Sequence, residues 1–182
     1  GRVWLIALCA LISLVPAFDV VAASKQPPTI TAQPQDLVVL TGGAASFSVT
    51  ATGTAPLYYQ WRKNGVPITG ATATSYSLAT VTTNNAADYD VVVNNAIGTA
   101  TSAVATLTVY VPPWFAVQPT NRVVTAGGNA AFTAGALGIP TPALQWFFGT
   151  NRLPGQVSST LSLANVQASQ AGSYYCVATN VT

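Results

Sequence analysis

In Ala45-Ser-Phe-Ser-Val-Thr-Ala51, apolar side chains alternate with the hydroxyl-bearing side chains of Ser and Thr. Successive side chains of a β-strand point to opposite faces of a sheet, so this stretch predicts a strand with one buried and one solvated face. Tyr59 and Trp61 share a face of the next alternating run, and Asn64-Gly65 behind it is typical of a tight hairpin turn. No later stretch shows sustained helical periodicity. The sequence therefore predicts short antiparallel strands.

An internal repeat with a constant offset of 85 residues runs through the chain. Gln60-Trp61 corresponds to Gln145-Trp146, and Tyr89 corresponds to Tyr174, with no insertion between them. Such a register indicates two homologous domains. Around seven short strands in each repeat predict an antiparallel sandwich of two sheets.

Both copies carry the same series of motifs. The first contains Trp61, Tyr76-x-Leu78, Asn85-x-Ala87-x-Tyr89-x-Val91 and Asn95-x-x-Gly98. The second contains Trp146, Leu161-x-Leu163, Gln170-x-Gly172-x-Tyr174-x-Cys176 and Asn180. These series resemble immunoglobulin-like domains, most closely the intermediate (I-set) type. The resemblance implies an all-β fold of two tandem antiparallel Ig-like β-sandwiches.

The resemblance also implies which side chains form the core. They are Val49, Trp61, Tyr89 and Val91 in the first copy, and Ala134, Trp146, Tyr174 and Cys176 in the second. The two tyrosines are expected to form tyrosine corners, in which the hydroxyl bonds to nearby backbone. Val49–Val91 and Ala134–Cys176 occupy the positions where the family usually has a disulfide, whose loss typically costs about 2–5 kcal/mol. Cys176 lacks a His to activate it, and we interpret it as structural.

The chain divides into four expected segments. Residues 1–23 combine one positive charge, a short apolar run and small residues, which predicts a secretory signal peptide. The first domain is expected over 26–110, a linker over 111–113, and the second domain over 114–182. The run that matches Thr101–Val109 of the first copy would fall beyond residue 182, so we expect the second sandwich to lack its final strand.

The composition leaves few groups for chemistry. The chain has no His, four acidic residues in total, and only 5% charged residues. It therefore offers no imidazole base, no usual zinc site and almost no carboxylate pair for hydrolysis. A net charge of +2 from scattered basic residues gives no electrostatic footprint for nucleic acid. We expect a non-catalytic protein with no cofactor, no metal, no nucleic-acid partner and no membrane span in the mature fragment.

One pair of exposed side chains is a candidate partner contact. Phe147 and Tyr175 each neighbour an inward-facing residue, so both should point outward on adjacent strands. The first copy has Arg62 and Asp90 at these positions, where an ion pair across the sheet is expected rather than a Ca²⁺ site. The alternative is that a neighbouring domain covers the aromatic pair. Exposed aromatic patches are typical of protein contacts.

Three functions fit this sequence. We favour a non-catalytic module of a secreted or cell-surface protein, acting as a spacer or an adhesion element. Its candidate partners are protein or carbohydrate at the cell surface, and further Ig-like or other domains of the same chain. The disulfide-free tandem copies resemble the Ig-like arrays of large exported bacterial proteins. The alternatives are an accessory region of a large secreted enzyme, such as a polysaccharide-degrading one, and a eukaryotic-type receptor ectodomain.

Overall fold

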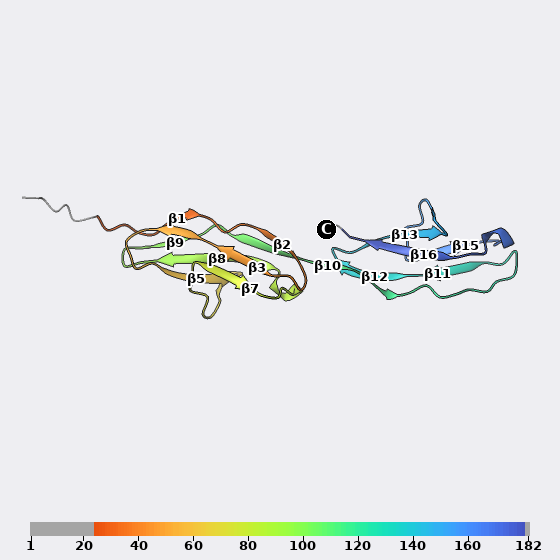
Figure 1. The fold of residues 1–182 in the computed structure, drawn as a ribbon, viewed down its shortest axis with the longest axis horizontal. Coiled ribbons are helices and arrows are strands. Elements are labelled where there is room, and N and C mark those ends of the chain that lie inside the picture. The colour runs from red at the N-terminus through yellow and green to blue at the C-terminus, as the bar shows by residue number, and fades with distance from the viewer. Residues whose placement is uncertain (1–23, 181–182) are drawn as a thin grey trace, which may run out of the picture.

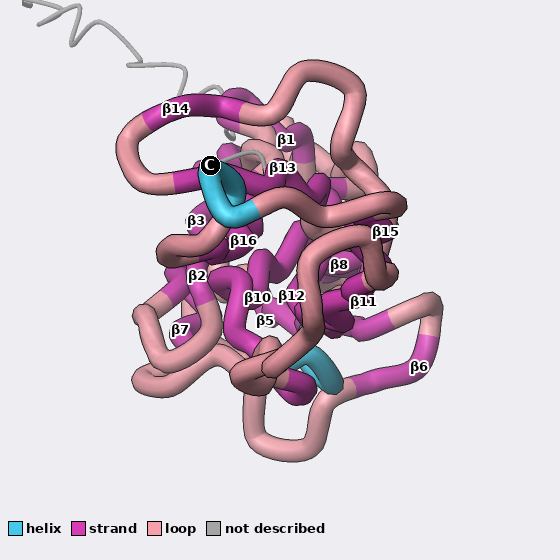
Figure 2. The backbone as a smooth tube through the Cα atoms, turned by 90° about the vertical axis from the view of Figure 1, so that its right-hand side faces the viewer, coloured by secondary structure: helices cyan, strands magenta, loops and turns pink. Residues whose placement is uncertain are grey.

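Residues 24–180 are described by a computed structural model, and the expected signal peptide of residues 1–23 lies outside this range. Two β-sandwiches follow one another end to end along the chain (Figure 1). Helix is limited to two short 3-10 turns among the described residues, η1 (Thr83–Asn85) and η2 (Ala168–Gln170), cyan in Figure 2. The expected fold of two tandem all-β sandwiches is confirmed.

The first sandwich contains two short sheets and one large sheet. The short sheets are the pairs β1 (Thr29–Ala32) with β4 (Thr50–Thr52) and β3 (Ala45–Ser48) with β7 (Ser75–Leu78). The large sheet contains β6 (Val66–Pro67), β5 (Tyr58–Lys63), β8 (Ala87–Asn94), β9 (Thr99–Thr101), the start of β10 (Ala105–Val117), and β2 (Leu37–Leu40). β2 runs parallel to β10, and every other pairing is antiparallel. Asn64 and Gly65 both adopt positive φ in the β5–β6 hairpin, as that turn requires.

Alternating side chains of these sheets meet in the first core. The Phe47 and Tyr89 rings stack with their centroids 4.8 Å apart, and the Trp61 and Tyr76 rings lie against this pair. Leu107 of β10 is 1% exposed in the same core. Each fully buried aliphatic or aromatic side chain contributes about 1.5–3 kcal/mol, so this cluster accounts for much of the sandwich's stability.

Strand β10 belongs to both sandwiches. Its first half pairs with β8 and β2, and its second half pairs with β12 (Gly135–Ile139) of the second sandwich. Residues 111–113, expected as a linker, therefore lie within a continuous strand (Figure 1). Pro112 and Pro113 fall where the β10–β12 register shifts between Val111 and Trp114. Proline cannot donate to a ladder and is tolerated at such irregularities, which explains how the strand passes through them.

The second sandwich repeats the first with fewer strands. It contains β11 (Ala130–Thr133) with β15 (Thr160–Leu163), β12 with β10, and β13 (Ala143–Phe148) between β14 (Asn151–Arg152) and β16 (Tyr174–Thr179). Ala134, Trp146 and Leu161 form its buried centre. Within residues 24–180 it has no counterpart of β2, of β9 or of the first half of β10. Within the described residues, β16 pairs with β13.

Candidate interaction surfaces

The two tryptophans are core residues and not ligand platforms. Trp61 and Trp146 are both 0% exposed. Each indole N–H donates to a backbone carbonyl, that of Ala73 at 3.0 Å and that of Ser158 at 2.9 Å. A buried Trp normally needs such a partner for its N–H, and here both are satisfied in the same way.

The two tyrosines hold equivalent corners at the start of β8 and at the start of β16. The Tyr89 hydroxyl donates to the Asn85 carbonyl at 2.9 Å, and the Tyr174 hydroxyl donates to the Gln170 carbonyl at 2.8 Å. Burial raises the pKa of both phenols, and Tyr76 adds a smaller contribution at Tyr89. Both hydroxyls are engaged in backbone contacts, which leaves neither placed as a general acid.

The positions of the family's disulfide are apolar contacts here. Val49, Val91 and Ala134 are buried, and Cys176 is half-buried against the second core. Burial raises the pKa of the Cys176 thiol, so less of it is thiolate at neutral pH. The described residues bring no group of three His, Cys, Asp or Glu side chains together as metal ligands. Nothing around Cys176 activates it as a nucleophile.

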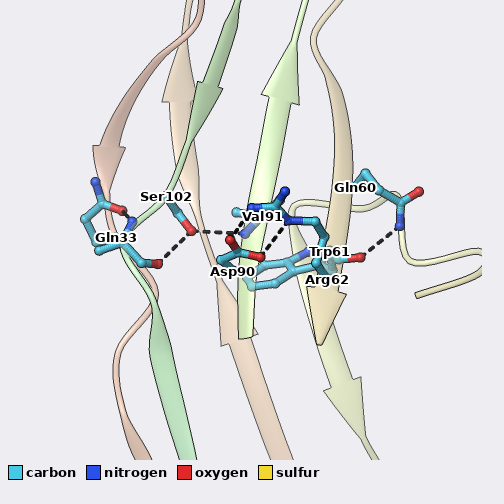
Figure 3. Close-up of polar contacts among 8 residues, drawn as sticks. Gln33, Gln60, Trp61, Arg62, Asp90, Val91 and Ser102 are labelled. Carbon is cyan, nitrogen blue, oxygen red and sulfur yellow. Dashed lines mark hydrogen bonds and ion pairs between the residues drawn. The ribbon is translucent and has the colours of Figure 1, made fainter. Parts of the chain in front are cut away.

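Arg62 and Asp90 form an ion pair across β5 and β8 (Figure 3). Arg62 Nε donates to Asp90 Oδ1 at 2.9 Å, and Arg62 Nη2 donates to Asp90 Oδ2. Asp90 is only 8% exposed although it lies on the outer face of the sheet. The hydrogen bonds that Arg62 donates to Asp90 raise the pKa of the guanidinium, burial lowers it, and the charge of Asp90 raises it further. Both carboxylate oxygens are therefore occupied by Arg62.

Hydrogen bonds between side chains and backbone lie beside this ion pair and join neighbouring segments. The Val91 N–H donates to Ser102 Oγ at 3.0 Å, and Ser102 Oγ donates to the Ala103 carbonyl at 2.8 Å. The Ala103 N–H donates to Gln33 Oε1 at 2.9 Å (Figure 3). Gln60 Nε2 donates to the Trp61 carbonyl at 2.9 Å on the other side. Each polar side chain named here is thus hydrogen-bonded to a neighbour within the first sandwich.

The same face of the second sandwich is aromatic. Phe147 and Tyr175 pair directly across β13 and β16, the register position that Arg62 and Asp90 take in the first copy. Their rings are stacked with centroids 5.1 Å apart and planes 6° apart. Tyr175 is 43% exposed, and Val177 is 38% exposed two residues further along the strand. Phe147 is half-buried, so the structure brings the two candidate contact residues together with Tyr175 as the exposed member of the pair.

The structure also shows an exposed apolar pair that was not predicted from the sequence. Trp114 pairs with Leu137 across β10 and β12, and the two side chains are 54% and 52% exposed. The corresponding pair of the first copy is Thr29 with Thr52. Aligning the two copies position by position would have shown this change from threonine to large apolar residues. The outward direction of the Trp114 and Leu137 side chains follows only from the register of β10 and β12.

Asn180-Val181-Thr182 matches the glycosylation sequon Asn-x-Ser/Thr, and the Asn180 side chain has a structural role. Its Nδ2 donates to the Val111 carbonyl at 2.8 Å and to the Pro140 carbonyl at 3.0 Å. Asn95, its counterpart in the first copy, donates in the same way to the carbonyls of Gln26 and Thr54. A glycan on Nδ2 would remove at least one of these two contacts, so the site is unsuited to modification.

Comparisons with a family model and with known proteins agree on the family of this chain. The model of the immunoglobulin domain matches twice, over residues 27–95 and 112–180. The chain is 32% identical over 183 residues to the tyrosine-protein phosphatase Lar of Drosophila melanogaster, covering 86% of this chain and 9% of that protein. It is 32% identical over 173 residues to human Roundabout homolog 1, covering 85% and 10%.

Two further relatives extend this comparison. Endoglucanase C of Cellulomonas fimi is 31% identical over 163 residues, which cover 84% of this chain and 15% of that enzyme. The solved structure of Sidekick-1 immunoglobulin domains 1–4 superposes with a TM-score of 0.72 at 21% identity, covering 89% of this chain and 47% of that one. The chain thus spans a small part of the length of the curated relatives named here. No helix within residues 24–180 is long and apolar enough to cross a membrane.

Proposed function

The chain belongs to the immunoglobulin domain family, and from this premise we propose that it is a non-catalytic, extracellular adhesion module that binds protein through its second sandwich. The observation that carries the proposal is the difference between the two copies at one register position. The first sandwich has the Arg62–Asp90 ion pair there, and the second has the half-buried Phe147 stacked on the exposed Tyr175.

Aromatic side chains are favoured in protein contacts because they bury a large area and lose little conformational entropy. Phe147 and Tyr175 are held by neighbouring strands and by each other, so their rings are ordered before a partner arrives. Val177 extends the apolar surface along β16. A compact aromatic cluster with an aliphatic neighbour is the composition that binding hot spots share.

The shared strand supports a spacer role beside the adhesion role. β10 passes from one sandwich to the other without leaving the extended conformation, and each half is held by a ladder. Such a joint resists bending more than a free linker does, because bending it would break strand pairs. We propose that it keeps the second sandwich at a fixed reach from the first.

The test exchanges the aromatic pair for the ion pair that the first copy already uses. Beads that carry the chain are mixed with each other and, separately, with intact cells, and adhesion is compared with the variant Phe147→Arg/Tyr175→Asp. We expect adhesion in one of the two mixtures, and a loss of at least about tenfold in the variant, since hot-spot residues each contribute about 2 kcal/mol or more. Circular dichroism checks that the variant is folded. Equal adhesion of both proteins, or none, would overturn the proposal.

A second candidate function rests on the similarity to endoglucanase C. In this alternative the two sandwiches are an accessory region that holds a catalytic domain at a distance within one polypeptide. The similarity of 31% covers most of this chain, which favours this role beside adhesion. Mass spectrometry of the polypeptide isolated from its source separates the roles. A glycoside hydrolase domain in the same polypeptide supports the accessory role, and its absence supports the adhesion role.

A further inference from the structure

A cation lies beside the Phe147–Tyr175 pair on the outer side of the second sandwich. Arg152 of β14 pairs directly with Phe147 of β13, and directly paired residues of neighbouring strands direct their side chains to the same face. Gln145, two residues before Phe147 on β13, lies on this face as well. Arg152 is exposed, as are Tyr175 and Val177 on β16. The aromatic face is the name used below for Gln145, Phe147, Arg152, Tyr175 and Val177.

The guanidinium of Arg152 is oriented by a short series of hydrogen bonds. Arg152 Nε donates to Gln145 Oε1 at 2.8 Å. The Gln145 amide is itself fixed, because its Nε2 donates to the Leu153 carbonyl at 2.7 Å and to the Trp146 carbonyl at 2.9 Å. Within residues 24–180, no hydrogen bond or ion pair involves Arg152 Nη1 or Nη2. The planar end of the side chain is thus held in place, with its remaining N–H groups available to a partner.

The first sandwich has the cation of the corresponding face neutralised. Arg62 there donates to both carboxylate oxygens of Asp90. The counterpart of Arg152, 85 residues earlier, is Pro67, which has no side-chain donor. The second sandwich therefore also has an arginine on this face, but on the neighbouring strand β14, at the edge of the sheet and without a carboxylate beside it.

Charge is distributed unequally between the two copies. Residues 24–110 contain three basic and three acidic residues, whereas residues 111–182 contain Arg122, Arg152 and no Asp or Glu. Arg122 Nε donates to the Ala131 carbonyl at 2.9 Å, in the sheet of β11 and β15, so Arg122 does not belong to the aromatic face. The aromatic face offers one oriented guanidinium beside apolar side chains. A planar guanidinium matches a single carboxylate, whereas a polyanion is attracted by a cluster of cations.

We propose that Arg152 is the specificity-determining residue of the aromatic face, and that it selects a protein partner presenting an Asp or Glu side chain next to an apolar one. This inference rests on the proposed adhesion function and names the chemistry of its partner. Nη1 and Nη2 of Arg152 donate to the two oxygens of the partner's carboxylate, and the partner's apolar side chain packs on Phe147 and Tyr175. Because Gln145 already holds the guanidinium, Arg152 loses less conformational entropy on binding.

The experiment extends the bead and cell adhesion assay of the full chain to three single variants. Arg152→Gln removes the cation, and we expect adhesion to fall at least about tenfold, because a charge-assisted hydrogen-bonded pair is lost. Arg152→Lys keeps the charge without the planar fork, so its adhesion should lie between those of Arg152→Gln and the unmodified chain. Arg122→Gln, the matched control on the other sheet, should stay within about threefold. Circular dichroism checks that all three variants are folded.

Treatment of the partner surface identifies the source of the carboxylate. Conversion of surface carboxylates to amides with carbodiimide and methylamine should abolish adhesion, and so should trypsin digestion of that surface. Sialidase and heparan lyase remove the anionic groups of glycans and should leave adhesion unchanged. Loss of adhesion after either glycan treatment would assign the partner to a glycan and would overturn the proposal.

Salt provides a readout that a merely structural role of Arg152 would not change. Added NaCl should weaken adhesion of the unmodified chain more than that of Arg152→Gln, since salt screens an ion pair at the surface. Adhesion that is lost in Phe147→Arg/Tyr175→Asp but retained in Arg152→Gln would overturn this proposal and leave the proposed function standing. Equal losses in Arg152→Gln and Arg122→Gln would also overturn this proposal alone. Absence of adhesion by the unmodified chain would overturn both.

Discussion

The Arg62–Asp90 pair offers a direct test of how the outer faces of the two sandwiches are stabilised. Asp90→Ala removes a carboxylate whose side chain is 11% exposed and leaves Arg62, 28% exposed, without its partner. Exposed ion pairs contribute about 0–1 kcal/mol, and breaking a fully buried pair costs about 3–5 kcal/mol. Because this pair is intermediate, we expect the first sandwich to lose about 2 kcal/mol, which raises its unfolded fraction about thirtyfold.

The chain supplies its own control for this substitution. Arg62→Phe/Asp90→Tyr installs the pair that Phe147 and Tyr175 form at the same register position. Replacing an ion pair by well-packed apolar side chains is often neutral or stabilising, so we expect a change within about 1 kcal/mol. The assay is native-state hydrogen exchange of the full chain, read at the slowest amides of β8. A double variant as unstable as Asp90→Ala would refute this reasoning.

Four further predictions concern single side chains. Tyr89→Phe and Tyr174→Phe should each cost about 1 kcal/mol in thermal unfolding, since each deletes one hydrogen bond, and a cost in only one sandwich would contradict the shared corner. Because folding raises both phenol pKa values, the stability they give is full below the unfolded pKa near 10 and falls as the pH rises through the folded values, which an alkaline titration of unfolding measures. Burial likewise raises the pKa of Cys176, so iodoacetamide should label it more slowly in the folded chain than in denaturant at pH 8, and equal rates would contradict this. Asn180 should remain without glycan after expression in a glycosylating host, as intact mass will show, and full occupancy would contradict its structural role.

The sandwich architecture was accessible from the sequence because side-chain alternation and the repeat are local properties. The alternating run around Phe47 became the strands β3 and β4, which pair with β7 and β1, and Asn64-Gly65 formed the hairpin turn. The approach of Phe147 to Tyr175 also followed, since the family places those two strands side by side. Each of these features depends on residue spacing and not on the details of packing.

The continuous strand β10 was not accessible in this way. Proline and the residue before it both favour extended backbone, so Val111-Pro-Pro113 has the same local preference in a free linker and in a strand. Only the ladder with β12 distinguishes the two, and that ladder depends on where residues 135–139 fold. The Trp114–Leu137 pair was missed for the same reason, because its direction depends on the register of this ladder.

The central claim is that the second sandwich, and not the first, carries the contact surface of this chain. Hydroxyl-radical footprinting of the chain, free and in adhered beads or cells, tests it most directly. Phe147 and Tyr175 should be oxidised in the free chain and protected on adhesion, while Tyr58 of the first sandwich, 60% exposed, should be oxidised equally in both states. Protection of Tyr58 with unchanged oxidation of Phe147 and Tyr175 would contradict the claim.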